Sequence, residues 1–227
     1  KYLIYGKGLG SLHLKKNDKL NFGNSGTLAR LLIGILSTTP GIIANLQGDH
    51  SLNKRSMQKL IELMNKFGAS FLPRKKFTFP IKLISSDMPI GINYKAGISA
   101  QLKSAVILAG LNSYGDTKIT ETQRSRNHTE NMLLNNTRVI KIKDKQKKII
   151  TVFGKKYLNS IKINVPSDPS SAAFFSALTL LNKHSSITIK NVGLNSTRTG
   201  FYEHIKKQGA NIKFKNLVKN NNEVSGD

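Results

Sequence analysis

Cysteine is absent from this chain of 227 residues, and its absence excludes several kinds of chemistry at once. Without thiols there is no disulfide, no thiolate nucleophile and no thiolate metal ligand. The five histidines do not replace them, because they are scattered without the helical or finger-type spacing of metal ligands. They are His13, His50, His128, His184 and His204. We therefore expect no metal site.

Acidic residues are scarce. The chain has 12 of them against 36 lysines and arginines, which gives a net charge of +24. Such an excess usually suggests nucleic-acid binding. Here, however, the lysines are spread singly or in pairs over every segment. The chain is also rich in Asn and Ile, so a genomic bias toward AT-rich codons explains the excess, and we favour that interpretation. The charge still favours small, multiply anionic substrates.

Long apolar runs are missing too. The best candidate, Leu28 to Leu36, is interrupted by Arg30 and stops short of Pro40, so it is too short to span a bilayer. The first ten residues read as a strand-like run punctuated by glycines, without the cleavage-site pattern of a signal peptide. We expect a cytoplasmic protein that does not enter a membrane.

What the sequence does contain is a threefold internal repeat. Each copy starts with small polar residues and continues through an apolar helix, a strand and a loop that holds an arginine. The helices are predicted at Leu28–Leu36, Leu102–Leu111 and Ala172–Leu181, and the strands at Ile42–Leu46, Thr117–Glu121 and Ser186–Lys190. Arg55, Arg126 and Arg198 thus recur about 71 residues apart, which argues against coincidence.

A second helix follows each arginine, at Met57–Phe67, Glu130–Leu134 and Phe201–Gln208. The first and third end at Gly68 and Gly209, because glycine readily takes the left-handed conformation that closes a helix. Asn135-Asn136 are expected to replace glycine in the middle copy. Further strands are predicted at Ser70–Leu72, within Lys141–Val152 and at Asn211–Phe214. The repeating unit is βαβαββ, which predicts a mixed α/β protein with the apolar first helices at its centre.

Two motifs in the first copy suggest anion binding. Asn24-Ser25-Gly26-Thr27 precedes a helix whose N-terminal N–H groups attract anions, although an ordinary N-cap has the same pattern. Lys54-Arg55 place two cations before the next helix, and the arginine fork suits a carboxylate or phosphate. Seven of the 36 basic residues are arginines, and four of them occupy repeated positions: Arg30, Arg55, Arg126 and Arg198.

The middle copy holds two more polar motifs. Ser99-Ala100-Gln101 opens an apolar helix and offers hydrogen bonds to hydroxyls and phosphate oxygens, or serves as a plain cap. Ser125-Arg126 adds a hydroxyl and a guanidinium group, and we assign no catalytic role to the nearby His128. Asp168 in the third copy is predicted to cap its helix.

In this order, these motifs resemble the 5-enolpyruvylshikimate 3-phosphate synthase family of enolpyruvyl transferases. The resemblance covers nearly the whole chain, from Asn24-Ser25-Gly26-Thr27 through Ser125-Arg126-Asn127-His128-Thr129-Glu130 to Asn195-Ser196-Thr197-Arg198. It implies the two-lobed inside-out α/β barrel built from βαβαββ units. The first lobe would be mostly present as residues 1–164, without its start, and residues 165–227 would begin the second.

The resemblance also implies site residues and an activity. Phosphoenolpyruvate would contact Gly26, Arg55 and Gln101, and shikimate 3-phosphate would contact Ser99, Ala100, Gln101, Ser125 and Arg126, with Asn24, Thr27, Arg30 and Lys54 in support. The enolpyruvyl group would pass to the 5-hydroxyl of shikimate 3-phosphate, a step toward chorismate and aromatic amino acids. It implies a monomer without a cofactor, and glycine at position 26 implies sensitivity to glyphosate.

Two departures from the family pattern stand out. Ser56 replaces a proline that usually follows the arginine, which is expected to loosen Arg55 slightly. The family's catalytic residues, near its amino terminus and late in its chain, have no counterpart, so no catalytic residue is assigned. We expect a fragment that binds shikimate 3-phosphate weakly and does not turn it over.

Two alternatives stay open. UDP-N-acetylglucosamine enolpyruvyl transferase shares the repeat but usually carries a reactive cysteine, which this chain lacks. A basic nucleic-acid-binding module is suggested by charge alone, without the interleaved aromatic residues of such modules.

Overall fold

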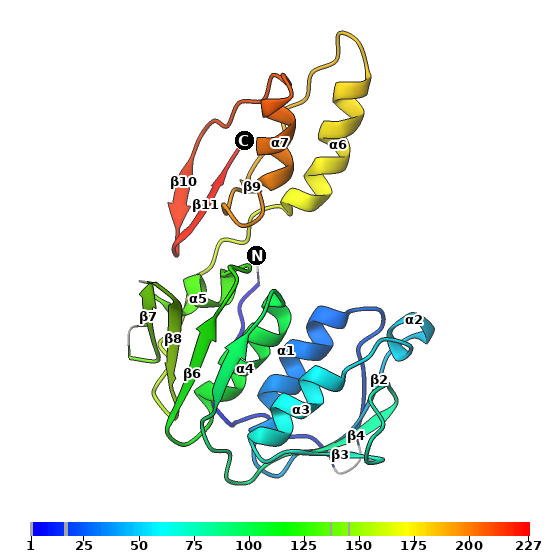
Figure 1. The fold of residues 1–227 in the computed structure, drawn as a ribbon, viewed down its shortest axis with the longest axis vertical. Coiled ribbons are helices and arrows are strands. Elements are labelled where there is room, and N and C mark those ends of the chain that lie inside the picture. The colour runs from blue at the N-terminus through cyan, green and yellow to red at the C-terminus, as the bar shows by residue number, and fades with distance from the viewer. Residues whose placement is uncertain (1, 16–17, 137, 145) are drawn as a thin grey trace. The chain divides into compact units, whose positions relative to one another are not determined.

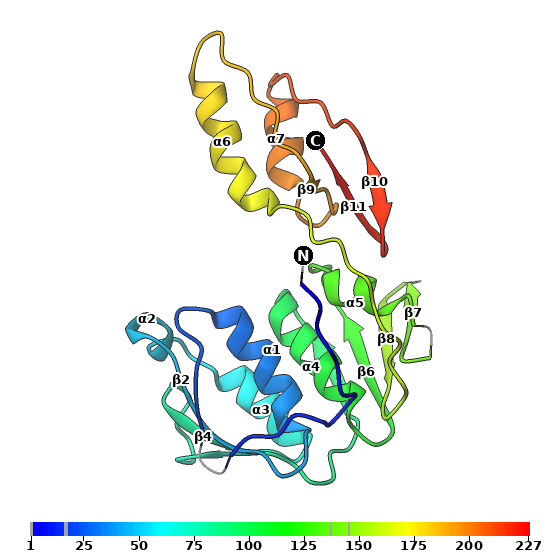
Figure 2. The same ribbon diagram turned by 180° about the vertical axis from the view of Figure 1, so that it is seen from behind.

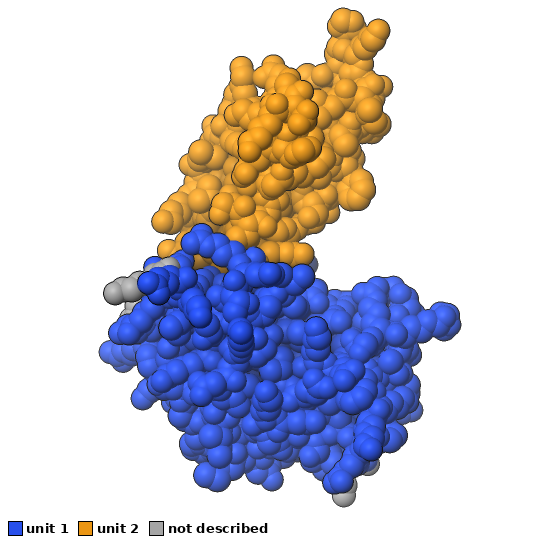
Figure 3. Space-filling view, viewed as in Figure 1, with its two compact units in different colours: residues 1–125, 136–159 blue, residues 126–135, 160–227 orange. Residues whose placement is uncertain are grey.

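A computed structural model describes residues 2–15, 18–136, 138–144 and 146–227. These residues form two compact units, one of residues 1–125 and 136–159 and one of residues 126–135 and 160–227 (Figure 3).

The strands of the first unit form two four-stranded sheets of identical topology. The first sheet has the order β1-β2-β4-β3, with strands Asp18–Asn21, Ile43–Gln47, Ile81–Ile84 and Ser70–Leu72. The second has the order β5-β6-β8-β7, with strands Asn93–Ala96, Asp116–Glu121, Lys148–Phe153 and Ile140–Asp144. In both sheets the first pair is parallel and the others are antiparallel, so the predicted βαβαββ repeat is confirmed for these two copies.

The helices of the first unit are α1 (Gly26–Ser37), α2 (His50–Asn53), α3 (Gln58–Lys66) and α4 (Ala100–Leu111). Helices α1 and α4 lie side by side between the two sheets, with α3 beside them (Figure 1 and Figure 2). Strands β2 and β4 alternate buried and half-buried residues, as expected of sheets with one covered face. The central position predicted for the first two apolar helices is therefore confirmed.

Close approach of α1 and α4 depends on a glycine. A Cβ added to Gly34 would lie 2.6 Å from the carbonyl oxygen of Ala105, closer than any van der Waals contact allows. The glycine therefore lets the two helix backbones pack directly against each other, which brings their N-terminal ends onto one scaffold.

The second unit contains α5 (His128–Leu133), α6 (Pro169–Leu181), α7 (Gly200–Lys207) and a sheet of order β10-β11-β9. Its strands are Val218–Asn220, Glu223–Gly226 and Val192–Gly193. A small core of Ala172, Val192 and Tyr202 joins α6 to α7 and the sheet.

Three predictions for this part of the chain were wrong. Residues 186–190 and 211–214, all of which the structure describes, belong to no strand. Their side chains are mostly exposed, so burial does not favour pairing there. Asn135 and Asn136 do not take the left-handed conformation, whereas Gly68 and Gly209 do, with φ of 96° and 95°.

The predicted central position of the third apolar helix is also not observed. Within α6, every residue of which is described, only Pro169 and Ala172 are buried. Phe174 and Leu181 are 79% and 84% exposed, because nothing in the described part of the second unit covers this face of the helix. None of the helices formed by the described residues is both long and apolar enough to cross a bilayer.

Candidate functional site

The N-terminus of α1 places Gly26, which is buried, between two guanidinium groups. Ser25 caps the helix, since its Oγ accepts from the Leu28 N–H at 3.1 Å. Arg30 donates from Nη1 to the Gly26 carbonyl at 3.0 Å, and Arg55 donates from Nη2 to the Asn24 Oδ1 at 3.0 Å. One helix end thus gathers polarised N–H groups and two cations, an arrangement that attracts anions.

Gly26 leaves room for both guanidinium groups close to the helix end. A Cβ at this position would lie 2.7 Å from Arg30 Nη1 and 3.4 Å from Arg55 Nη1. Because glycine has no side chain, both guanidinium groups come close to the backbone at the helix end.

Local hydrogen bonds determine where Arg55 lies. Asp49 caps α2 by accepting from the Leu52 N–H at 2.8 Å, and the Arg55 N–H donates to the Leu52 carbonyl at 3.0 Å. Leu52 is buried, so it anchors the turn that carries Arg55. Ser56, where the resemblance leads one to expect a proline, accepts from the Gln58 N–H at 3.3 Å. The neighbouring Lys54 is exposed at the C-terminal end of α2.

The positive charge of this cluster favours binding of an anion. Burial lowers the pKa of Arg30 below its ordinary value, and the nearby positive charge of Arg55 lowers it further. Like charges held together are stabilised by an anion placed between them. Arginine side chains keep their positive charge at neutral pH, so the cluster is cationic.

The N-terminus of α4 joins this cluster through Gln101. Ser99 caps α4 by accepting from the Leu102 N–H at 3.4 Å, and Ala100 and Gln101 form its first turn. Gln101 donates from Nε2 to the Thr27 Oγ1 at 2.7 Å, across 74 residues of sequence. The capped N-termini of α1 and α4 therefore meet. The sequence motifs predicted each helix end separately, but they could not show that the two ends lie together.

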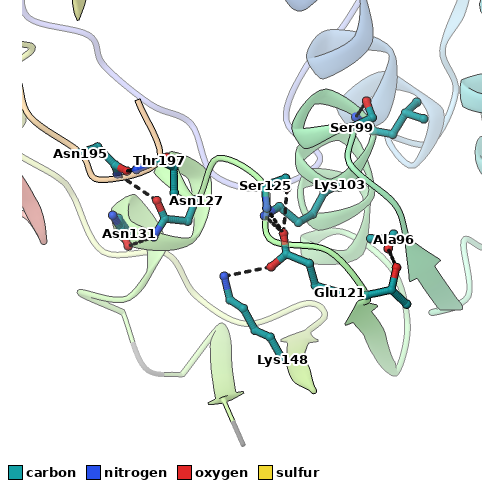
Figure 4. Close-up of polar contacts among 12 residues, drawn as sticks. Ala96, Ser99, Lys103, Glu121, Ser125, Asn127, Asn131, Lys148, Asn195 and Thr197 are labelled. Atoms are coloured by element: carbon teal, nitrogen blue, oxygen red, sulfur yellow. Dashed lines mark hydrogen bonds and ion pairs between the residues drawn. The ribbon is translucent and has the colours of Figure 1, made fainter. Parts of the chain in front are cut away.

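Ser125 is held by a buried acidic residue that sequence reasoning missed (Figure 4). Its N–H and Oγ donate to the Glu121 Oε1 at 2.9 and 2.8 Å, and Lys103 donates to the same oxygen from Nζ at 2.7 Å. Lys148 Nζ forms an ion pair with Oε2 at 3.1 Å. The sequence did contain a signal of a buried acidic partner. Lys103 is a charged residue in the apolar helix α4, at a position that such a helix should bury.

These contacts determine the charge of Glu121. Burial opposes ionisation and would raise the pKa, but hydrogen bonds from Lys103 and from Ser125 outweigh it, and the pKa falls from 4.5 to about 2. Glu121 is therefore an anion at neutral pH.

Arg126 is exposed and belongs to the second unit, so it is not placed relative to the cluster around Gly26. The structure therefore brings together Asn24, Gly26, Thr27, Arg30, Arg55 and Gln101, and on the same unit it holds Ser99, Ala100, Lys54 and Ser125.

The second unit carries its own polar cluster beside a pocket of about 330 Å³. Asp168 caps α6, which confirms the predicted cap, and it accepts from Arg198 at 2.6 Å. Glu223 accepts from the amides of Asn131 and Asn195 at 3.0 and 2.9 Å, and its Oε1 lies 2.8 Å from the His128 Nδ1. Across the parts of the chain that the structure describes, no three His, Asp or Glu side chains are grouped as a metal site would require.

Comparison with known proteins agrees with these motifs. Residues 2–225 match the family model of EPSP synthase (3-phosphoshikimate 1-carboxyvinyltransferase). The chain is 43% identical over 227 residues to the 3-phosphoshikimate 1-carboxyvinyltransferase of Thermodesulfovibrio yellowstonii, covering 99% of this chain and 52% of that protein. It is 40% identical over 214 residues to that of Paramagnetospirillum magneticum, covering 93% and 48%. The chain thus spans about half the length of these relatives.

Solved structures give the same result. EPSP synthase from Acinetobacter baumannii superposes with a TM-score of 0.78 at 36% identity, over 92% of this chain and 46% of that one. The enolpyruvyl transferase NikO from Streptomyces tendae matches at 11% identity with a TM-score of 0.53, over 86% and 45%, and supports the fold alone. The fold is therefore that of the enolpyruvyl transferases, and, with the family match over residues 2–225, this chain belongs to the EPSP synthase family.

Proposed function

We propose that this chain binds phosphoenolpyruvate and shikimate 3-phosphate for transfer of the enolpyruvyl group to the 5-hydroxyl of shikimate 3-phosphate. The observation that carries the proposal is the meeting of two capped helix N-termini, with Gly26 between Arg30 and Arg55 and with Gln101 bonded to Thr27. Both substrates are anions, and this cluster supplies the positive charge and the N–H groups that anions need.

Each substrate has a proposed set of contacts. Arg55, Gly26 and Gln101 would take phosphoenolpyruvate, whose carboxylate and phosphate suit a guanidinium fork. Ser99, Ala100, Gln101, Ser125 and Arg126 would take shikimate 3-phosphate through hydroxyl, amide and guanidinium hydrogen bonds. Asn24, Thr27, Arg30 and Lys54 would support the first set.

The cluster stabilises negative charge, but its arginines do not exchange protons at neutral pH. We therefore assign it substrate binding and charge stabilisation, and no residue described here is assigned a proton transfer. We also propose that residues 1–164 belong to the first lobe and 165–227 to the second. The proposal includes a cytoplasmic, monomeric protein and inhibition by glyphosate at Gly26.

Calorimetric titration of the 227-residue chain tests the proposal. Shikimate 3-phosphate should bind, and phosphoenolpyruvate should bind in its presence. Arg55→Lys should weaken phosphoenolpyruvate binding about tenfold or more, because an ammonium cannot replace the planar fork. Arg74→Lys changes an exposed arginine outside the cluster and serves as the matched control.

Two results would contradict the proposal. One is tighter binding of UDP-N-acetylglucosamine than of shikimate 3-phosphate, which would favour the related transferase. The other is an equal effect of Arg55→Lys and Arg74→Lys, which would place the anion site elsewhere.

A further inference from the structure

Glu121 is a buried carboxylate at the end of β6, and three donors meet at one of its oxygens. Oε1 accepts from Lys103 Nζ at 2.7 Å, from the Ser125 N–H at 2.9 Å and from the Ser125 hydroxyl at 2.8 Å. The side chain of Lys103 is 0% exposed and that of Glu121 is 1% exposed. An ion pair buried this deeply costs desolvation and is weak evidence of a role in stability alone.

The network connects the two segments proposed to hold shikimate 3-phosphate. Lys103 lies on α4, two residues after Gln101, and its ammonium group reaches the carboxylate that holds Ser125. Because both the backbone and the side chain of Ser125 bond to Glu121, the position of Ser125 depends on α4 through a single carboxylate (Figure 4).

We propose that Glu121 is a positioning residue for shikimate 3-phosphate, because it holds Ser125 at a set place relative to the N-terminus of α4. The inference rests on the proposed function. The backbone N–H bond does the holding, whereas the hydroxyl can turn from Glu121 to a phosphate oxygen of the ligand. When it turns, Oε1 keeps two donors, Lys103 and the Ser125 N–H, so the buried carboxylate stays satisfied.

A double-mutant cycle on the full 227-residue chain separates positioning from general stability. Glu121→Gln should weaken shikimate 3-phosphate binding about tenfold, because the charge-assisted bonds to Ser125 are lost. Ser125→Ala should weaken it as well, and the double variant should bind no more weakly than Ser125→Ala. Glu62→Gln, on the exposed face of α3, is the matched control and should bind as the unaltered chain does.

Two further measurements extend the test, and the first keeps it valid if Glu121→Gln folds poorly. Lys103→Met/Glu121→Gln also removes the buried ammonium group that Glu121→Gln alone would deprive of its carboxylate partner, and it should show the same loss of binding. In the ligand-free chain, amide hydrogen exchange at Ser125 should be faster in Glu121→Gln, while the amides of β6 keep their protection.

The results distinguish the two proposals. If the unaltered chain binds neither substrate, the proposed function fails. If it binds and Ser125→Ala weakens binding while Glu121→Gln does not, the function stands and the positioning role is overturned. Additive losses in the double variant, or an unchanged Ser125 exchange rate in Glu121→Gln, would overturn the positioning role as well.

Discussion

Gly26 shows how a single missing side chain can shape an anion site. The space that a Cβ would occupy lies 2.7 Å from Arg30 Nη1 and 3.4 Å from Arg55 Nη1. Both neighbours are ends of flexible side chains, so they can move aside at little cost in stability. Once displaced, however, the two guanidinium groups no longer keep their position relative to each other.

Gly26→Ala should therefore affect binding far more than folding. We expect phosphoenolpyruvate affinity to fall by roughly ten- to a hundredfold, because small displacements of charged groups are costly in a site of this kind. The free energy of unfolding should change by less than about 1 kcal/mol, since alanine also favours the helix. Calorimetry and thermal unfolding measure the two effects. A large loss of stability with unchanged affinity would show that the glycine serves packing instead.

Glu121 predicts how acid acts on stability. Its pKa in the folded chain is about 2, below its ordinary value of 4.5. A group with a lowered pKa stabilises the fold fully above the unfolded value and loses that contribution as the pH falls toward the folded value. This contribution is thus present above about pH 4.5 and disappears between there and about pH 2.

Glu121→Gln tests this pH dependence, because glutamine does not titrate. The melting temperature of the variant should lie below that of the unaltered chain near pH 7, and the gap should narrow as the pH falls below 4.5. Thermal unfolding followed by circular dichroism from pH 7 to pH 3 measures it. A gap that is constant with pH would mean that the carboxylate charge does not contribute.

At the scale of elements, the crossing of α1 and α4 carries the site. Gly34→Ala would place a Cβ 2.6 Å from the Ala105 carbonyl oxygen, which is backbone and cannot swing away. We expect a loss of about 1–3 kcal/mol in the free energy of unfolding, since overpacked cores cost that much. Gly6→Ala is the matched control, because nothing lies within 4 Å of its Cβ position.

The same substitution should weaken substrate binding, because the Gln101 to Thr27 bond spans the two helices that would be pushed apart. Chemical denaturation gives the stability and calorimetry gives the affinity. Equal stability of Gly34→Ala and Gly6→Ala would contradict the close-packing account.

At the scale of the whole molecule, the second unit carries an exposed apolar helix. Phe174, Phe175, Leu178 and Leu181 on α6 are all exposed, by 58% or more of their surface. Apolar surface gathered on one helix favours association.

We expect the chain to be monomeric when dilute and to associate through α6 as its concentration rises. Phe174→Ser/Leu181→Ser should reduce this association without changing substrate affinity. Light scattering across a concentration series measures it. The matched control is Leu3→Ser/Ile4→Ser, which removes exposed apolar groups outside α6. If both double variants reduce association equally, α6 is not the surface responsible.

Local chemistry made much of this protein predictable from its sequence alone. The caps at Ser25, Ser99 and Asp168 bond to N–H groups three residues away, so short-range pattern determined them. The periodic apolar helices and the repeated arginines likewise predicted three βαβαββ copies, of which the first two form as predicted. The family was indicated by the resemblance of the ordered motifs. Where a segment had little to bury, as at 186–190, the same reasoning predicted a strand that the chain does not form.

Tertiary structure decided which of these pieces meet. The Gln101 to Thr27 bond joins residues 74 apart, and the Lys103 to Glu121 bond joins residues 18 apart. Neither follows from spacing, because both depend on how α1, α4 and β6 pack. The sequence by itself determined which residues could cap, bind or carry charge, whereas packing of distant elements decided that Gly26 lies between two guanidinium groups and that Glu121 holds Ser125.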